Sequence, residues 1–124
     1  MFRPCYRVEV EGFIPEGCKR FTINLGIDDS NYVLHFDARF DYSGDNRMII
    51  LNSKRDDAWG EGRRESFFPL QEGSDTKICF QYEQDKIIIQ LPTGNPLSFP
   101  IRFPTMGTPY LAMKNLHLKS VIVT

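Results

Sequence analysis

The sequence of 124 residues lacks an excess of charge of either sign. It has 15 basic and 16 acidic residues, for a formal net charge of -1. The chain therefore lacks the excess of positive charge that binding to nucleic acid or to an anionic membrane surface requires. No apolar run is long enough for a membrane helix, and residues 1–12 lack the apolar stretch of a secretory signal. The sequence therefore predicts neither nucleic-acid binding nor membrane insertion.

Cysteines and acidic clusters are also scarce. Cys5, Cys18 and Cys79 are odd in number, widely spaced and without a CxxC pair, which argues against a zinc site. Free thiols suggest a reducing compartment. No cluster of acidic residues suits calcium. We expect three structural thiols, no metal and no cofactor.

Helical periodicity is nearly absent, and short apolar or alternating runs take its place. They recur about every 8 to 12 residues between clusters of Gly, Pro, Asp and Asn, which is typical of an antiparallel sandwich. With 41% hydrophobic residues, the chain is globular. We expect one all-β domain over 1–124, a two-sheet antiparallel sandwich with tight turns at EQD and PTGN. The expected strands are 6–10, 20–26, 32–40, 47–53, 65–70, 76–82, 86–91, 97–103, 109–113 and 116–124.

Alternation within these runs predicts which side chains face the core. The expected inner-face residues are Phe21, Ile23, Leu25, Phe36, Ile50, Phe80, Ile87, Ile89 and Phe99.

The run LHFDARF (34–40) places three polar groups at every second position. In a strand, its apolar residues face the core, while His35, Asp37 and Arg39 line the opposite face about 7 Å apart. An ordinary solvated sheet surface has the same pattern. The row alone therefore does not distinguish a binding site from a plain outer face.

The only tryptophan, Trp59, lies in a polar, glycine-bearing stretch between Asp57 and Gly60. An indole there is available as a flat apolar platform beside polar groups. Asn52 precedes it, and Glu61, Arg63, Arg64 and Glu65 follow. Planar bidentate groups such as Arg, Asn and carboxylates form directional hydrogen bonds with sugar hydroxyls, and an indole packs against the C–H face of galactose. This combination predicts binding of a neutral sugar.

The same residues resemble the signature of the galectins, lectins that bind β-galactosides. The family pattern is H-x-N-P-R, then Asn, then W-G-x-E-x-R; this chain has HFDAR (35–39), Asn52 and WGEGRR (59–64). Segments such as FTINLG, RESFFPLQEG and KICFQYEQDKIIIQLPTG are similar too, so the likeness covers nearly the whole chain. It implies a jelly-roll-like sandwich of the galectin and legume-lectin kind.

The resemblance also implies roles for individual residues in carbohydrate binding. His35, Asp37 and Arg39 would hold the axial hydroxyl and ring oxygen of galactose, and Asn52 the exocyclic hydroxymethyl group. Trp59 would stack on the apolar sugar face. Arg64 would hold the second sugar.

Three positions depart from the family pattern: Asp37 replaces Asn, Ala38 replaces Pro and Gly62 replaces Glu. Three alternatives follow. Asp37 supplies the missing carboxylate by pairing with Arg39, or a bulge at Gly60 or Gly62 turns Glu61 into the site. Otherwise the galactoside site is weakened, retuned to another sugar such as a mannoside, or lost, leaving a structural or protein-binding scaffold.

The resemblance further implies β-galactoside-bearing glycans and glycoproteins as partners. It implies a homodimer through the terminal strands, with Leu116, Leu118 and Val121 exposed on the last one. Family members work in the cytoplasm and, after export without a signal peptide, outside the cell. We expect the same localisation here.

An enzyme is the main rival interpretation. A glycosidase needs two carboxylates about 5–9.5 Å apart, one of them kept protonated by desolvation. Asp37 with Glu61 or Glu65 offers the pair, but neighbouring Arg39 and Arg64 would depress the carboxyl pKa values. His35 and His117 have no GxSxG serine as a partner. We therefore expect no catalytic residues.

Overall fold

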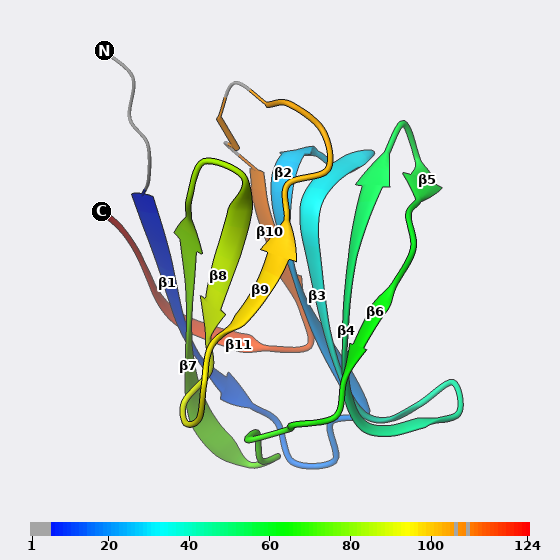
Figure 1. Ribbon diagram of the computed structural model, residues 1–124. Helices are drawn as coiled ribbons and strands as arrows, with labels where there is room; N and C mark the ends of the chain where they lie inside the picture. The colour runs from blue at the N-terminus through cyan, green and yellow to red at the C-terminus, as the bar shows by residue number, and fades with distance from the viewer. Residues whose placement is uncertain (1–5, 106, 109) are drawn as a thin grey trace. The chain divides into compact units, whose positions relative to one another are not determined.

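The computed structural model describes residues 6–124, apart from 106 and 109 (Figure 1). The described residues form eleven β-strands in two antiparallel sheets and contain no helix that could cross a membrane. The chain divides into two compact units, and each contains one sheet. Cys5 and Pro109, the first residue of the expected strand 109–113, lie outside the described residues.

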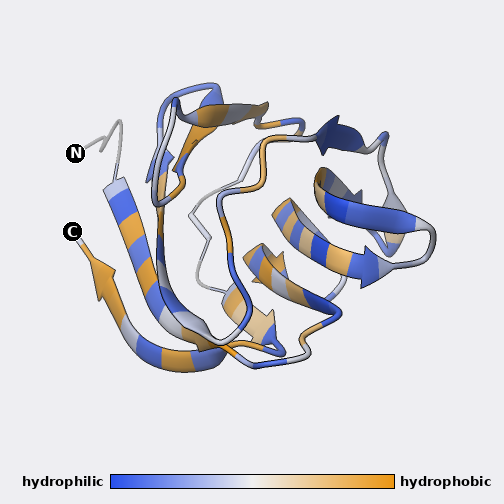
Figure 2. Ribbon diagram, turned by 90° about the horizontal axis from the view of Figure 1, so that it is seen from below, coloured by the Kyte–Doolittle hydropathy of each residue, from blue (hydrophilic) through white to orange (hydrophobic). Residues whose placement is uncertain are grey.

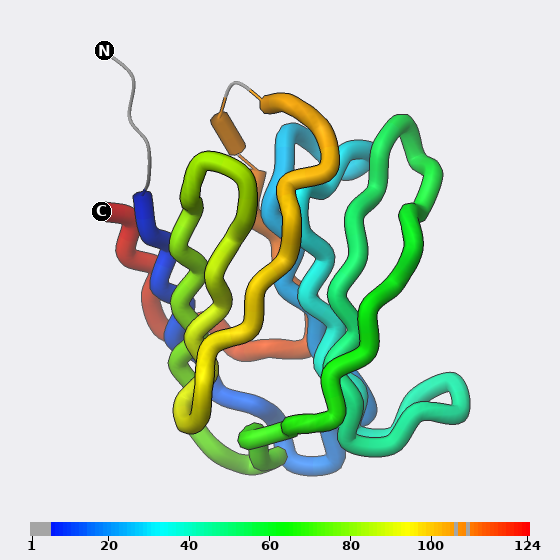
Figure 3. Tube along the Cα trace, in the orientation of Figure 1, coloured from blue at the N-terminus to red at the C-terminus, as the bar shows by residue number. Residues whose placement is uncertain are grey.

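The first sheet joins the beginning, the middle and the end of the chain. Its order is β11-β1-β7-β8-β9. The last strand lies beside the first at the edge of this sheet (Figure 3). At the predicted EQD turn, the Glu83 amide donates to the Lys86 carbonyl at 2.8 Å, which closes the hairpin between β7 and β8. The strands are β1 (Tyr6–Ile14), β7 (Ser74–Tyr82), β8 (Lys86–Gln90), β9 (Leu97–Pro100) and β11 (His117–Val123).

The second sheet carries the polar row that the sequence singles out. Its path is β10-β2-β3-β4-β5, with β6 also pairing with β4. The two longest strands, β3 and β4, are joined by a turn in which Ser43 and Gly44 have positive φ angles of 51° and 84°. The strands are β2 (Arg20–Asp28), β3 (Asn31–Tyr42), β4 (Asp45–Arg55), β5 (Ala58–Trp59), β6 (Arg63–Glu65) and β10 (Tyr110–Lys114).

Alternating hydropathy builds the buried face of each sheet, as the bands along the strand after the N-terminus show (Figure 2). All nine residues predicted to face the core are buried. One is nevertheless on the wrong face. Cross-strand partners share a face, and β3 and β4 pair Phe36 with Leu51 but Asp37 with Ile50. Ile50 therefore lies with the polar row, and the expectation that it faces inward is wrong.

The expected strand 65–70 is also wrong, because the strand β6 ends at Glu65. In the apolar run after it, Phe68 and Leu70 are buried without being paired in a sheet, whereas Phe67 is 48% exposed. Phe68 is 7% exposed and its ring meets that of Phe40 edge-on at 4.9 Å. Pro69 has no amide hydrogen to offer a sheet. Hydrophobicity in this segment indicated burial, which sequence alone does not separate from strand pairing.

Two of the three apolar residues expected to be exposed near the end of the chain are not exposed, and Val121 in β11 is half-buried. Leu116, expected to be exposed, is only 7% exposed. It covers Gly12, where a bulge interrupts the pairing of β1 with β11. Leu118, Ile122 and Val123 are the exposed apolar residues there, at 52%, 51% and 60%.

The thiols that the structure describes are both buried. The Cys79 sulfur is not in a disulfide and accepts hydrogen bonds from Arg7 Nε and Nη2 at 3.3 and 2.9 Å. The Cys18 sulfur lies 3.9 Å from the Asn115 carbonyl oxygen.

We expect Gly12→Ala to lower the free energy of unfolding by about 1–3 kcal/mol, the usual cost of overpacking. A Cβ at Gly12 would lie 2.8 Å from Leu116 Cγ and 3.0 Å from the His117 carbonyl oxygen, so β11 must shift. Gly62→Ala is the matched control, because its nearest neighbour would be 3.5 Å away. Urea unfolding of both variants measures the difference; equal stabilities would contradict the steric argument.

Candidate functional site

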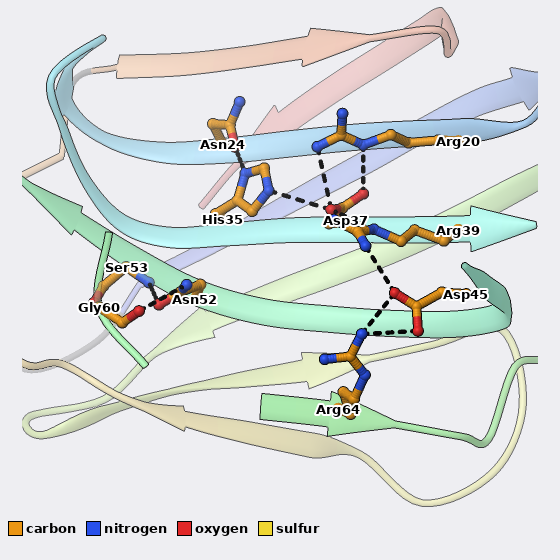
Figure 4. Close-up of polar contacts among 10 residues, drawn as sticks. All are labelled: Arg20, Asn24, His35, Asp37, Arg39, Asp45, Asn52, Ser53, Gly60 and Arg64. Atoms are coloured by element: carbon orange, nitrogen blue, oxygen red, sulfur yellow. Dashed lines mark hydrogen bonds and ion pairs between the residues drawn. The ribbon is translucent and has the colours of Figure 1, made fainter. Parts of the chain in front are cut away.

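The polar row of β3 lies on one face of the second sheet, beside polar side chains of β2 and β4 (Figure 4). It is not an ordinary solvated surface, because His35 is 8% exposed and Asp37 only 1%. Polar groups this deeply buried require partners. The partners of His35 and Asp37 come from the neighbouring strand β2 and from β3 itself.

Asp37 is held from both sides by guanidinium groups. Arg20, on β2, donates from Nε to Oδ1 at 2.8 Å and from Nη2 to Oδ2 at 3.2 Å. Arg39 donates from Nε to Oδ2 at 3.0 Å, and His35 Nε2 lies 3.5 Å from the same oxygen. Burial alone would raise the pKa of Asp37. Hydrogen bonds from His35 and Arg20 and the positive charge of Arg20 outweigh it and lower the pKa to about 2.

A second carboxylate, Asp45 at the start of β4, joins two further arginines. Arg39 Nη1 donates to its Oδ2 at 2.7 Å, and Arg64 Nη2 donates to its two oxygens at 2.7 and 2.8 Å. The hydrogen bond from Arg64 is the largest cause of the lowered pKa of Asp45; burial opposes it, and the hydrogen bond from Arg39 lowers the pKa further. Opposite charges thus alternate across the sheet. We call Arg20, Asp37, Arg39, Asp45 and Arg64 the charged row.

Asn52 is fixed by backbone groups and by an arginine from the loop that follows β9. Its Nδ2 donates to the Gly60 carbonyl at 3.1 Å, and its Oδ1 accepts from the Ser53 amide at 2.8 Å. Arg102 Nη1 lies 3.3 Å from the same Oδ1, and Arg102 Nη2 donates to the Glu61 carbonyl at 2.8 Å. Arg102 therefore anchors the segment that follows Trp59.

The Trp59 indole is 51% exposed although it belongs to the sheet. Its ring centroid lies 4.7 Å from that of His35, and Tyr32 lies 6.0 Å away. The Lys54 ammonium nitrogen is 5.1 Å from the centroid of the indole. The ring is thus supported by its neighbours while half of its surface remains open, beside the polar row.

A bulge separates β5 from β6, at the place where the sequence suggested one. Lys54 pairs with Trp59 and Leu51 with Arg63, so the three residues 60–62 stand opposite the two residues 52–53. A Cβ at Gly62 would lie 3.5 Å from Ile50 Cγ2 and 3.7 Å from Asn52 Nδ2, which directs it toward the polar face. Glu61 is exposed, and Arg39 and Arg64 pair with Asp45 rather than with Glu61.

The structure therefore brings together six of the seven residues singled out from the sequence and places Glu61 at the rim. Sequence reasoning missed four further polar residues. Asn24 Oδ1 lies 2.6 Å from His35 Nδ1, and the pairing of β2 with β3 sets these two residues opposite each other. Asp45 follows the turn between β3 and β4, and no chemical pattern in the sequence marked it. No local pattern marked Arg20 or Arg102.

The part of the chain that the structure describes contains no group of three or more His, Cys, Asp or Glu placed to hold a metal ion. What the site offers is hydrogen-bond donors, two carboxylates and an open indole.

Comparison with known proteins identifies this arrangement. A family model described as galactoside-binding lectin matches residues 1–123. The chain belongs to the galectin family. It is 46% identical to galectin-1 of the toad Rhinella arenarum over 119 residues, which cover 96% of this chain and 89% of that protein.

Two solved galectin structures illustrate the likeness. A toad ovary galectin in complex with N-acetylgalactose has a TM-score of 0.95 and 46% identity, covering 99% of this chain and 92% of that one. CG-16, a homodimeric agglutinin from chicken liver, has a TM-score of 0.93 and 33% identity, covering 98% and 92%. The prediction of an all-β sandwich of two antiparallel sheets is confirmed. Galectins are lectins and not enzymes, so the interpretation as an enzyme is excluded by the family.

The pKa of Asp37 predicts a pH dependence of stability. Because the folded-state pKa of about 2 lies below the ordinary value of 3.8, folding is stabilised above about pH 4 and loses this contribution as the pH falls through 2. The contribution is about 2 kcal/mol. Urea unfolding of the wild type and of Asp37→Asn between pH 6 and pH 2 measures it. The same pH dependence in both proteins would contradict the assignment.

Proposed function

We propose that residues 1–124 form one carbohydrate-recognition domain, which binds β-galactosides of the lactose type without a metal ion. The observation that carries the proposal is the half-exposed Trp59 ring, 4.7 Å from His35, at the end of a row of fixed guanidinium groups. A sugar with one apolar face and a ring of hydroxyls suits such a surface.

The arginines of the charged row supply donors that their carboxylate partners do not use. Arg39 Nε donates to Asp37 and Arg39 Nη1 donates to Asp45, so Nη2 remains for a ligand. Arg64 donates to Asp45 only through Nη2, so its Nε and Nη1 remain for a ligand. Guanidinium groups fixed in this way bind hydroxyls without losing further side-chain freedom. We assign these nitrogens to the hydroxyls of galactose and of the second sugar.

His35 and Trp59 define the orientation of the galactose ring. His35 Nδ1 is engaged with Asn24, and we assign Nε2, which also lies 3.5 Å from Asp37 Oδ2, to an axial hydroxyl. Trp59 packs against the C–H face of the same sugar. Asn52 contacts the exocyclic hydroxymethyl group through its Nδ2, which it shares with the Gly60 carbonyl. Glu61, exposed at the rim, contacts only longer ligands.

Asp45 takes the place of the carboxylate that the family carries where this chain has Gly62. It bridges Arg39 and Arg64, as a carboxylate between the two binding arginines must do. Asp37 adds a second carboxylate, which pairs with Arg39 at 3.0 Å. The modified site thus keeps its arginines in place by ion pairs of its own.

Affinity for one disaccharide in such an open site is weak, on the order of 0.1–1 mM. Crosslinking of glycans and glycoproteins then depends on two linked sites. The edge strand β11, with Leu118, Ile122 and Val123 exposed, is the surface that we assign to a homodimer. The homodimeric state of the similar chicken agglutinin supports this assignment.

A second candidate function follows from Asp37. A carboxylate there offers no amide donor, and its oxygens are already engaged by Arg20 and Arg39. Such a site suits a sugar with a different hydroxyl arrangement, such as a mannoside, or a scaffold that binds no sugar. Localisation both in the cytoplasm and outside the cell stays a prediction.

Titration with lactose, followed by Trp59 fluorescence, tests the main proposal. We expect a saturable spectral change with lactose, unaffected by a chelator, and a smaller one with a mannoside. A change with the mannoside alone supports the second candidate. The absence of any change, together with no retention on immobilised galactoside or mannoside, supports the scaffold.

We expect Trp59→Leu to abolish retention on immobilised galactoside without unfolding the protein. The ring is half exposed, so its loss removes the sugar platform but little buried surface. Retention and circular dichroism of the variant are the measurements, with Phe67→Leu, another exposed aromatic residue of the second unit, as the control. Undiminished retention would refute the platform role.

We expect Gly62→Glu to tighten galactoside binding by about 1 kcal/mol, the scale of one added hydrogen bond. A Cβ at Gly62 would lie beside Ile50 and Asn52 and would meet no atom closer than 3.5 Å. Calorimetry with lactose measures the change, and Gly62→Gln separates the charge from the added bulk. Weaker binding would show that the native geometry suits another ligand.

A further inference from the structure

A buried negative charge lies in the middle of the proposed sugar site. Asp37 is 1% exposed, and its Oδ2 is near the groups that a sugar needs: Arg39 Nε at 3.0 Å and His35 Nε2 at 3.5 Å. A buried carboxylate that lacks a counter-ion is costly and draws nearby donors toward itself. Without further compensation, Asp37 would compete with a sugar hydroxyl for His35 and Arg39.

Arg20 supplies that compensation from the neighbouring strand. The register of β2 with β3 pairs Arg20 with Arg39 and Thr22 with Asp37, so the Arg20 side chain reaches diagonally to the carboxylate. It binds both oxygens, at 2.8 and 3.2 Å, and the Nε of Arg20 is the donor that faces Oδ1 (Figure 4). A bidentate guanidinium of this kind fixes both the charge and the orientation of the carboxylate.

The Arg20 guanidinium is itself held in place. Its Cζ lies 4.5 Å from the centre of the Tyr42 ring, and Arg39 Cζ lies 5.2 Å from the centre of the same ring. Tyr42 thus contacts both arginines that bind Asp37. Because the contact combines stacking with a two-pronged ion pair, a lysine at position 20 would not reproduce it.

We propose that Arg20 is a positioning and specificity-determining residue of the galactoside site. By binding both oxygens of Asp37 from β2, it prevents this carboxylate from drawing His35 Nε2 and Arg39 Nη2 away from the ligand. Arg20 and Asp37 act as one unit that replaces the uncharged amide of the family pattern. The inference rests on the proposed galactoside function and adds a residue outside the family signature.

A coupled pair has a characteristic mutational behaviour. Removing Arg20 alone leaves Asp37 to pull on His35 and Arg39, which weakens sugar binding. Replacing Asp37 alone leaves Arg20 without its anion beside Arg39. Replacing both restores an uncharged pair, so the effects of the two changes do not add.

The experiment compares Arg20→Gln, Asp37→Asn and the double variant by calorimetry with lactose. We expect each single variant to bind about tenfold more weakly, as for the loss of a charge-assisted hydrogen bond, and the double variant to bind close to wild type. Arg63→Gln is the control, because it removes an exposed arginine of the same sheet from outside the charged row. Unchanged affinity of Arg20→Gln, or strictly additive effects, would overturn the proposal.

A measurement without sugar separates this inference from the proposed function. Carbon NMR of the Asp37 carboxyl follows its titration in the wild type and in Arg20→Gln, and we expect the variant to titrate at higher pH. If the wild type binds no galactoside but the titration shifts, the proposed function fails and Arg20 still holds Asp37. If lactose binds and the titration is identical, Arg20 has no positioning role. Should Arg20→Gln fail to fold, Arg20→Lys is measured in the same way, since it keeps the charge but loses the two-pronged contact.

Discussion

The structure of the site depends on a carboxylate that is almost completely removed from water. Asp37 lies in the central strand pair of its sheet with two guanidinium groups and an imidazole directed at it. An isolated charge at this depth would destabilise the fold by several kcal/mol, so its partners are structural necessities and not optional surface ion pairs. The placement of Arg20, Arg39 and His35 follows from this requirement.

A rigid set of donors results from the alternation of charges across the strands. Each arginine of the charged row has at least one carboxylate partner, and each carboxylate has two arginines. Side chains fixed in this way have already lost their conformational freedom before a ligand arrives. The open indole beside them adds apolar contact area at little further entropic cost. The side chains of this surface are therefore fixed in position in the absence of a ligand.

The sequence predicted most of the strands and the polar row on β3, but not the contacts that join distant segments of the chain. Residue alternation in 34–40 is sufficient to separate Phe36 from Asp37, because the period of a strand is two. The face of Ile50 was not predictable, since the run MIIL contains no polar residue to set the phase; only its pairing with Asp37 does so. Arg20 and Arg102 escaped notice because their contacts join segments 17 and about fifty residues apart. Such contacts depend on register and loop geometry, which one sequence does not specify.

One contact at the rim has a consequence for how this surface diversifies. Arg102 anchors the segment after Trp59 through the carbonyl oxygen of Glu61, a group that every amino acid presents. The anchor is therefore indifferent to the side chain at position 61. Evolution or selection from a library can therefore change the side chain at position 61, and with it the charge and size of the group at the rim. The hydrogen bond from Arg102 to the backbone is kept.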